Sequence, residues 1–259
     1  MTQIRNRAGT VLFTSNDEDV VSALEHAAEE GIDLSGAVLD EMDLSGANIE
    51  EARLTGASFR RAHLEGANLE EADLSTADFS GAWLAGANLE EANLTGANLE
   101  GASLEDANFE EADLHHANLA GARAQGANFE ESVLAGANLS GLQCEGGNFE
   151  ESDLAGAGLR GARLSRANME KCNLRGADLS RAELAEANLE KAHLDDANLE
   201  GAELRMANVE KASLRGARLA GADLTAANFE RADLTGADLT GARTAGTNFE
   251  DARGTDFRF

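Results

Sequence analysis

Pairs of neighbouring glutamates recur along this chain at one fixed interval, and they are the side chains best placed to do chemistry. The motif is Asn, an apolar residue, Glu and a second charged residue, as in Asn108-Phe109-Glu110-Glu111. It returns every twenty residues from Asn48 to Asn248 with no insertion or deletion. Paired carboxylates can exchange protons as a general acid and base, or attract a basic partner electrostatically.

The first glutamates of these pairs predict one row along the molecule, and the second glutamates predict a parallel row beside it. The candidate interaction edge consists of the twelve residues Glu50, Glu51, Glu70, Glu71, Glu90, Glu91, Glu110, Glu111, Glu130, Glu131, Glu150 and Glu151. Beyond it the second row changes sign, to Lys171, Lys191, Lys211 and Arg231, while the first row stays Glu to Glu250. The later part of the edge is therefore expected to form Glu–Lys ion pairs, which are worth little individually.

Catalysis is not predicted from these carboxylates. They form a ladder and do not converge in a cleft, and no nucleophile is placed beside a base. The adjacent His115 and His116 have no third ligand in register, so we interpret them as surface histidines and predict no metal and no cofactor. The spacing places Cys144 and Cys172 on different inward sides, which favours buried free thiols in a reducing cytoplasm over a disulfide.

The elements that position the glutamates follow from a second, shorter period. Every fifth residue from Leu34 to Phe249 is apolar, with Thr244 as the exception, and Ala usually stands two residues before it. A helix would place apolar residues three and four apart. In a short extended segment, residues two apart point to the same side, so Ala and Leu both point inward and the frequent Gly turns the chain. Four such sides make one coil of twenty residues.

The five-residue units resemble those of a known family. Ala67-Asn68-Leu69-Glu70-Glu71 and Ala97-Asn98-Leu99-Glu100-Gly101 are similar to the rungs of pentapeptide-repeat proteins. The resemblance implies an all-β solenoid, a right-handed quadrilateral β-helix over residues 32–253, with about eleven coils spaced by roughly 4.8 Å. It implies little about activity, because the family is a class of scaffolds. Its best understood members bind DNA gyrase, give quinolone resistance and resemble DNA in shape and charge.

Both ends of such a rod need covering, because an open sheet edge invites aggregation. Residues 1–31 lack the repeat and predict an N-terminal cap, made of a hairpin over 4–13 and a helix with an apolar stripe. Ser15 or Asn16 is expected to cap this helix, with an acidic first turn over 17–19 and an end at Gly31. Residues 254–259 are expected to close the other end. Within them, Phe257 and Phe259 could plug the last coil.

The acidic charge is concentrated in the first part of the chain. The formal net charge is −27, of which −24 falls on residues 1–160 and −3 on residues 161–259. Residues 32–160 carry −20, which gives about one charge per 1.6 Å of rod, close to the roughly 1.7 Å of duplex DNA. A chain this acidic is not expected to bind nucleic acid directly. It also lacks an apolar run long enough to cross a membrane.

Several functional interpretations are open at this point. The preferred one is a non-catalytic structural or protein-interaction rod, in which the acid gives solubility or was inherited by duplication. The alternative is a DNA mimic that binds DNA gyrase or another basic DNA-binding protein, so a type II topoisomerase is the candidate partner. A salt-rich cytoplasm would predict acid throughout, which residues 161–259 contradict. It is also open whether the sequence is natural or a designed repeat. No C-terminal helix like that of the dimeric gyrase-binding relatives is present, which leaves a monomer or an end-to-end dimer.

Overall fold

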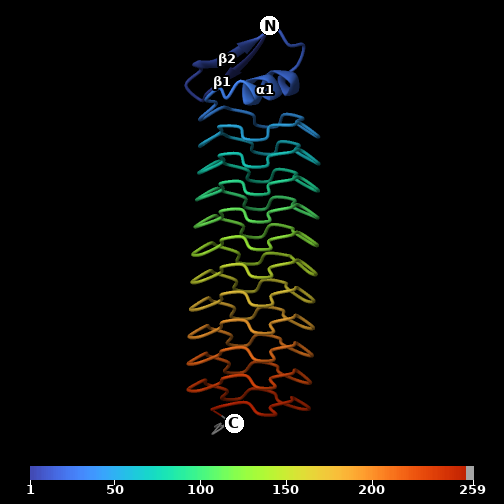
Figure 1. The fold of residues 1–259 in the computed structure, drawn as a ribbon, viewed down its shortest axis with the longest axis vertical. Coiled ribbons are helices and arrows are strands. Elements are labelled where there is room, and N and C mark those ends of the chain that lie inside the picture. The colour runs from blue at the N-terminus through green and yellow to red at the C-terminus, as the bar shows by residue number, and fades with distance from the viewer. Residues whose placement is uncertain (255–259) are drawn as a thin grey trace.

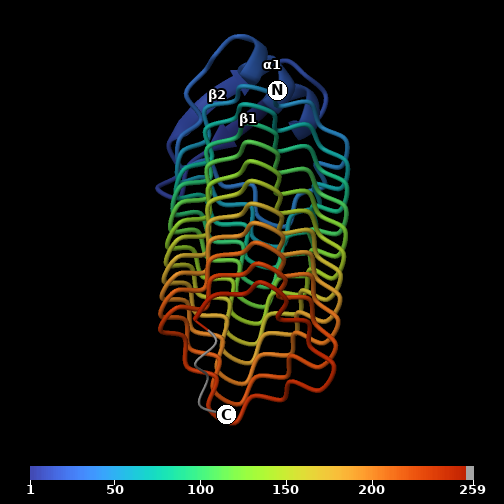
Figure 2. The same cartoon turned by 60° about the horizontal axis from the view of Figure 1, so that its bottom comes forward.

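The computed structural model of this protein describes residues 1–254 as a rod of stacked coils with a small cap at its N-terminal end (Figure 1). Bridging residues pair in parallel with the residue twenty positions later, from Asp33 with Arg53 to Asp233 with Arg253. Figure 2 shows the coils stacked in register, seen obliquely from the C-terminal end. The predicted right-handed quadrilateral β-helix is confirmed.

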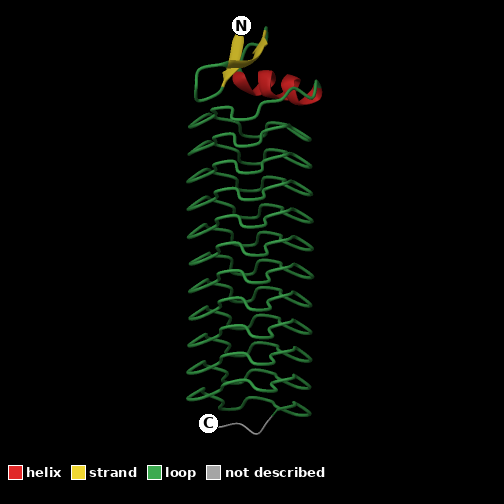
Figure 3. Ribbon diagram, turned by 90° about the vertical axis from the view of Figure 1, so that its left-hand side faces the viewer, coloured by secondary structure: helices red, strands yellow, loops and turns green. Residues whose placement is uncertain are grey.

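One rung shows why this coil satisfies its own backbone. Asn68 donates its N–H to Ala47 O of the preceding coil (2.9 Å), and Leu69 and Glu71 donate to the following coil (2.7 and 2.9 Å). The N–H of Glu70 donates to the side chain of Asn68 (3.3 Å), and the turn closes by a bond from the N–H of Ala72 to Leu69 O (3.1 Å). Each side is so short that the bridges stay isolated, and the coils are drawn as loops in Figure 3. Each backbone N–H of this rung from Asn68 to Ala72 thus has a partner, as a buried chain requires.

The core is a continuous column of Ala and Leu along the axis of the rod. Leu94 and Leu114, one coil apart on the same side, are both fully buried. Aromatic rings stack from coil to coil where Phe replaces Leu, as between Phe59 and Phe79, whose centroids lie 4.7 Å apart. This stacking follows from the coil-to-coil repeat, which places equal side chains directly above one another. No hollow for a ligand opens inside the described rod, because small and large apolar side chains fill it.

The cap contains the strands β1 (Thr2–Arg5) and β2 (Val11–Ser15) and the helix α1 (Val20–Glu29). The predicted hairpin and helix are thus confirmed, but the predicted N-cap is wrong. Asp19 caps α1 by accepting the Ser22 N–H (2.8 Å), and no acidic residue stands in the first turn.

The reason for this error lies in the strand before the helix. Ser15 belongs to β2, and its hydroxyl bonds Asp17 instead of a helix N–H. Asn16 therefore cannot start a helix, and α1 begins only after Asp19. The C-terminal prediction is right: Gly31, at φ +63°, donates to Ala28 O (2.8 Å) and Ile32 donates to Ala27 O (2.9 Å). This pair of bonds is the Schellman arrangement that glycine favours.

The cap supplies acceptors that a preceding coil would otherwise provide. The N–H of Val38 donates to Arg5 O at the end of β1 (2.8 Å), and the N–H of Asn48 donates to the Glu25 carboxylate of α1 (3.0 Å). Ala23, Leu24 and Ala27 of α1 are buried against the core. The cap thus covers the first coil with both apolar surface and hydrogen-bond partners.

The predicted closing segment is described only at its first residue, Gly254, so the predicted plug by Phe257 and Phe259 lies outside the described residues. Over residues 1–254 no helix has both the length and the apolar composition that crossing a membrane would need.

Candidate functional site

The structure brings all twelve predicted glutamates onto one edge of the rod. We call Glu50 and its equivalents every twenty residues to Glu150 the inner row, and Glu51 and its equivalents to Glu151 the outer row; together they are the acidic edge. The register is set by the backbone, because the N–H of Glu71 donates to Glu90 O and that of Glu91 to Glu110 O, both at 2.9 Å. The rows therefore rise by one coil per carboxylate pair.

Carboxylates of the inner row are half-buried, with Glu50 as the exposed exception, and each is tied to the next coil. Each accepts the amide of the Asn eighteen residues later, at 2.9–3.4 Å; for Glu70 the donor is Asn88 at 3.0 Å. These bonds align the carboxylates along the rod. Each carboxylate has further acceptor sites for a partner.

Sequence reasoning missed the asparagine ladder that supports this row. The Asn of each motif donates its amide to the side-chain oxygen of the Asn one coil earlier, from Asn68 to Asn248, at 2.8–3.2 Å. The same oxygen accepts the N–H of the inner-row glutamate. The available signal was an Asn at every twentieth position, because a twenty-residue offset places these side chains one above another.

The outer row has an unusual backbone. All eleven residues of its column, from Glu51 to Asp251, are non-glycine and have φ between 53° and 59°. The other three corner columns of the rod have the same left-handed turn but hold Gly at 8, 8 and 6 of their eleven positions. An L-residue in this conformation is disfavoured by roughly 1 kcal/mol or more relative to Gly. This corner therefore carries charged side chains where the fold would favour Gly.

Like-charge repulsion adds to that strain. The pKa of Glu71 is raised, first by the charge of Glu91 one coil away. The pKa of Glu90 is also raised, first by desolvation and then by Glu110 and Glu70. Over residues 1–254, the salt bridges to the two rows begin only at Lys171, which contacts Glu150 (3.5 Å) and Glu151 (2.7 Å). The acidic edge is therefore unneutralised along most of its length.

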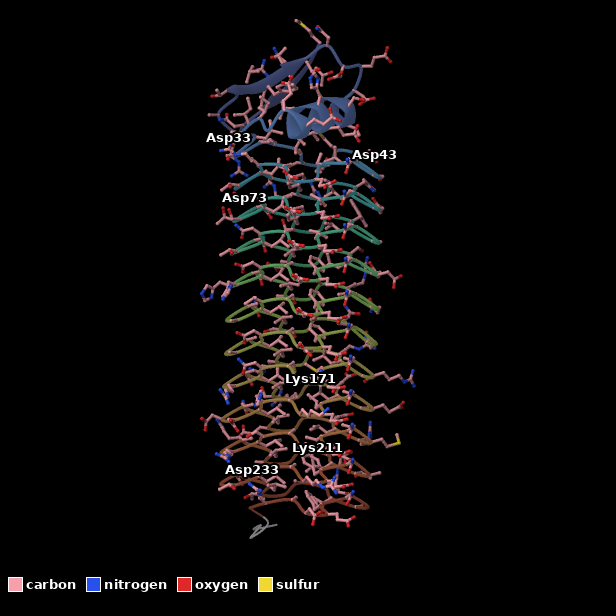
Figure 4. The ribbon with its side chains drawn as sticks, in the orientation of Figure 1. Asp33, Asp43, Asp73, Lys171, Lys211 and Asp233 are labelled. Carbon is pink, nitrogen blue, oxygen red and sulfur yellow. The ribbon has the colours of Figure 1, made fainter. Side chains whose placement is uncertain are left out.

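Beyond the acidic edge the same corner is neutralised, as the sign change predicts. We call the continuation of the two rows from Glu170 to Asp251 the paired edge. Lys191 contacts Glu170 and Glu190, both at 3.0 Å, and Lys211 contacts Glu210 at 2.7 Å. Figure 4 shows Lys171 and Lys211 one above the other along this corner. The pKa of Glu190 is accordingly lowered, first by its hydrogen bond to Lys191.

The remaining candidate groups have other surroundings. Cys144 and Cys172 are buried free thiols, and burial raises the pKa of both, to about 12 for Cys144. The imidazole of His115 lies 2.7 Å from Asp113, and no group of three potential metal ligands occurs within residues 1–254. Neither the two cysteines nor His115 and His116 belong to a group of three potential metal ligands within residues 1–254.

Comparison with known proteins identifies the repeat. The family model described as pentapeptide repeats (8 copies) matches overlapping segments between residues 30 and 258. The chain belongs to the pentapeptide-repeat family. This family generally consists of non-catalytic structural and interaction proteins. No curated protein sequence matches the chain significantly.

Three solved structures illustrate the likeness of this pentapeptide-repeat protein to others. HetL, involved in heterocyst differentiation regulation in the cyanobacterium Nostoc sp. strain PCC 7120, is 32% identical over 93% of this chain and 98% of its own, with a TM-score of 0.46. Rfr23 from the cyanobacterium Cyanothece 51142 is 30% identical over 42% of this chain and 89% of its own (TM-score 0.41). Full-length QnrB1, a plasmid-mediated fluoroquinolone resistance protein, is 22% identical over 81% of this chain and 92% of its own (TM-score 0.22).

Proposed function

We propose that this protein is a non-catalytic interaction rod whose acidic edge binds a basic protein surface. The observation that carries the proposal is the outer row. Its glutamates occupy a backbone conformation that favours Gly, and they stand next to like charges in the adjacent coils. Backbone strain and like-charge repulsion both lower the stability of the rod at this corner. Their coincidence on one surface indicates that this surface has a function.

The physical consequence of this edge is a negative field along one corner of the rod. Carboxylate pairs repeat at the coil spacing of roughly 4.8 Å, and the Asn ladder holds the inner row in place. Such a field speeds the approach of a basic partner and makes the affinity fall steeply with salt. The competing explanation is a charged scaffold whose acid serves only solubility.

A second candidate function is mimicry of DNA towards a type II topoisomerase such as DNA gyrase. The charge density supports it: residues 32–160 carry −20, about one charge per 1.6 Å against roughly 1.7 Å in duplex DNA. QnrB1, by its description, acts in fluoroquinolone resistance. A supercoiling assay with purified gyrase, with and without a quinolone, tests this candidate. The candidate would be supported if the parent protein inhibits supercoiling or protects gyrase from the quinolone. It would be contradicted if the protein has no effect on supercoiling at low salt.

The interaction proposal is tested by removing charge without changing shape. The test variant replaces Glu70, Glu71, Glu90, Glu91, Glu110 and Glu111 by Gln. We expect the variant to fold and its binding to an arginine-rich peptide, measured by fluorescence anisotropy at low salt, to fall at least about tenfold. The parent's affinity should decrease steeply between low and physiological salt.

The matched control replaces Glu190, Glu210 and Glu230, which already contact Lys or Arg, by Gln. It should change binding less than about twofold, because these carboxylates are neutralised. Equal binding by the parent and the six-fold variant would contradict the proposal. So would a parent protein that fails to bind the peptide at low salt.

We also propose a reducing, cytoplasmic location. The two buried free thiols, Cys144 and Cys172, support it, because such thiols are typical of reducing compartments. Fractionation of the cells that produce the protein is the direct test, and recovery outside the cytoplasm would contradict it.

A further inference from the structure

The only tryptophan of the chain, Trp83, is an outward residue, separated from Glu90 of the acidic edge by the corner at Gly86 and the side that carries Asn88. Its exposed fraction is 36%, which makes it one of four exposed large apolar side chains within residues 1–254. Two of the others, Met1 and Val11, belong to the cap. Every other described residue in the column of Trp83 is polar or charged. An exposed indole in this position is typical of a contact residue, since Trp is enriched among the residues that dominate binding energy.

The indole of Trp83 is held in place on one face. The His63 imidazole stacks on it nearly in parallel, with centroids 4.3 Å apart and planes at 13°. His63 is positioned in turn by Glu65, whose carboxylate lies 3.2 Å from Nδ1. The next residue of the column, Ser103, has a small buried side chain. The ring is thus pre-oriented, and its remaining exposed area is available to a partner.

The corner that follows Trp83 is formed by glycine in its own coil and in the preceding coil. Gly86 forms this corner in the coil of Trp83 and Gly66 in the preceding coil, and an added Cβ at either would meet no atom within 4 Å, whereas the following coil carries Asp106 there. In the coils beside the paired edge the same corner carries Arg166, Glu186 and Met206. A partner that extends from the acidic edge to Trp83 therefore crosses the side that carries Asn88 and meets no side chain at Gly86.

The charges around Trp83 indicate which kind of side chain would bind there. Glu65 lies beside the stacked His63, and Glu90 of the inner row follows Trp83 by seven residues, beyond the corner at Gly86 and the side that carries Asn88. The nearest arginine of the column, Arg123, is bonded to Glu105 (2.9 Å) and to Ser103. A cation over the face of Trp is attracted by the ring, and Arg combines this charge with a planar group that stacks.

We propose that Trp83, stacked on His63, is the docking site for an arginine side chain of the basic partner that the acidic edge attracts. This inference rests on the proposed function and adds a specific anchor to it. The acidic edge supplies long-range attraction, and Trp83 supplies a short-range contact. The two contributions differ in salt dependence, because stacking is screened less than the attraction between exposed charges.

The test uses the fluorescence of Trp83, which is free of interference because the chain has no other Trp and no Tyr. The full-length protein is titrated at low salt with a peptide of eight Arg-Gly units and with its Lys-Gly counterpart. We expect the arginine peptide to shift or quench the emission with the same midpoint as its binding by anisotropy. The lysine peptide should bind through the acidic edge with a smaller change in emission.

Trp83→Ser places at this position the residue that the next coil has, so folding should be retained. We expect this variant to bind the arginine peptide roughly 3- to 30-fold more weakly and the lysine peptide within about twofold of the parent. The salt dependence of binding should stay that of the parent. Met206→Ser, which removes another exposed apolar side chain beside the paired edge, is the matched control and should leave both affinities unchanged.

The outcomes separate this inference from the proposed function. If the arginine peptide binds the parent and Trp83→Ser equally, with unchanged Trp83 emission, the docking site is wrong and binding by the acidic edge stands. If neither peptide binds the parent at low salt, the proposed function fails and the docking site fails with it.

Discussion

Glu111 and Lys191 occupy the same corner of the rod, in almost the same left-handed backbone, with φ of 55° and 59°. Glu111 stands in a row of carboxylates, whereas Lys191 contacts Glu170 and Glu190. Their coils share the Ala-Leu core and the same ladder of Asn side chains. The comparison shows that the core and ladder determine the shape of the rod, while the charge of its corner varies independently of that shape.

The largest expected effect concerns what the two regions share. Leu94→Ala beside the acidic edge and Leu194→Ala beside the paired edge should each lower the free energy of unfolding by about 2–5 kcal/mol, because both side chains are fully buried. Chemical denaturation followed by circular dichroism measures this. Leu94→Asp should prevent folding of the neighbouring coils. A stably folded Leu94→Asp variant would contradict the inward register.

The next prediction removes the difference between the edges. Replacing Lys171, Lys191 and Lys211 by Glu extends the unneutralised rows towards the C-terminus. We expect a melting temperature lower by at least about 2 °C, since ion pairs are replaced by like-charge contacts. Binding of an arginine-rich peptide at low salt should become tighter. A variant as stable as the parent would mean that the charges of this corner have no effect on stability.

Smaller effects are expected from pH, with opposite signs at the two edges. Because the pKa of Glu71 is raised in the folded protein, its unfavourable contribution is present at pH 7 and disappears as the pH falls through that pKa. Glu71→Gln should therefore raise the melting temperature at pH 7 and change it little at about pH 4. Thermal denaturation at the two pH values is the measurement.

Glu190 should behave in the opposite way. Its pKa is lowered, so its stabilising contribution is present above the ordinary glutamate pKa and is lost as the pH falls through the folded value. Glu190→Gln should lower the melting temperature at pH 7 and have almost no effect at about pH 3. Changes of the same sign for Glu190→Gln and Glu71→Gln at pH 7 would contradict the comparison.

The smallest effect separates backbone strain from charge. Glu111→Gly relieves the left-handed conformation and one like-charge contact, so a modest rise in melting temperature is expected. Lys191→Gly relieves the same conformation but loses contacts to Glu170 and Glu190. Its melting temperature should rise less or not at all. Equal rises for the two variants, measured by calorimetry, would mean that only the backbone matters.

The five-residue period was enough to predict the solenoid, the inward Leu94 and the alignment of the twelve glutamates. This works because each coil contacts only its neighbours, so a local period becomes a spatial column. The Lys171–Glu151 contact followed from the same register, since an offset of twenty residues is one coil. The start of α1 could not be obtained this way, because outside the repeat Ser15 has two competing roles, and pairing in β2 prevailed over capping.

The sequence by itself determined that this protein is a rod, which side chains point into it and where its acid is concentrated, because exact periodicity converts spacing into position. Only the tertiary structure decided what those side chains contact. The bond from each Asn to the inner row depends on rotamers in two adjacent coils. The period places His63 one coil before Trp83, but the nearly parallel stacking of their rings, with planes at 13°, depends on side-chain rotamers that no period encodes.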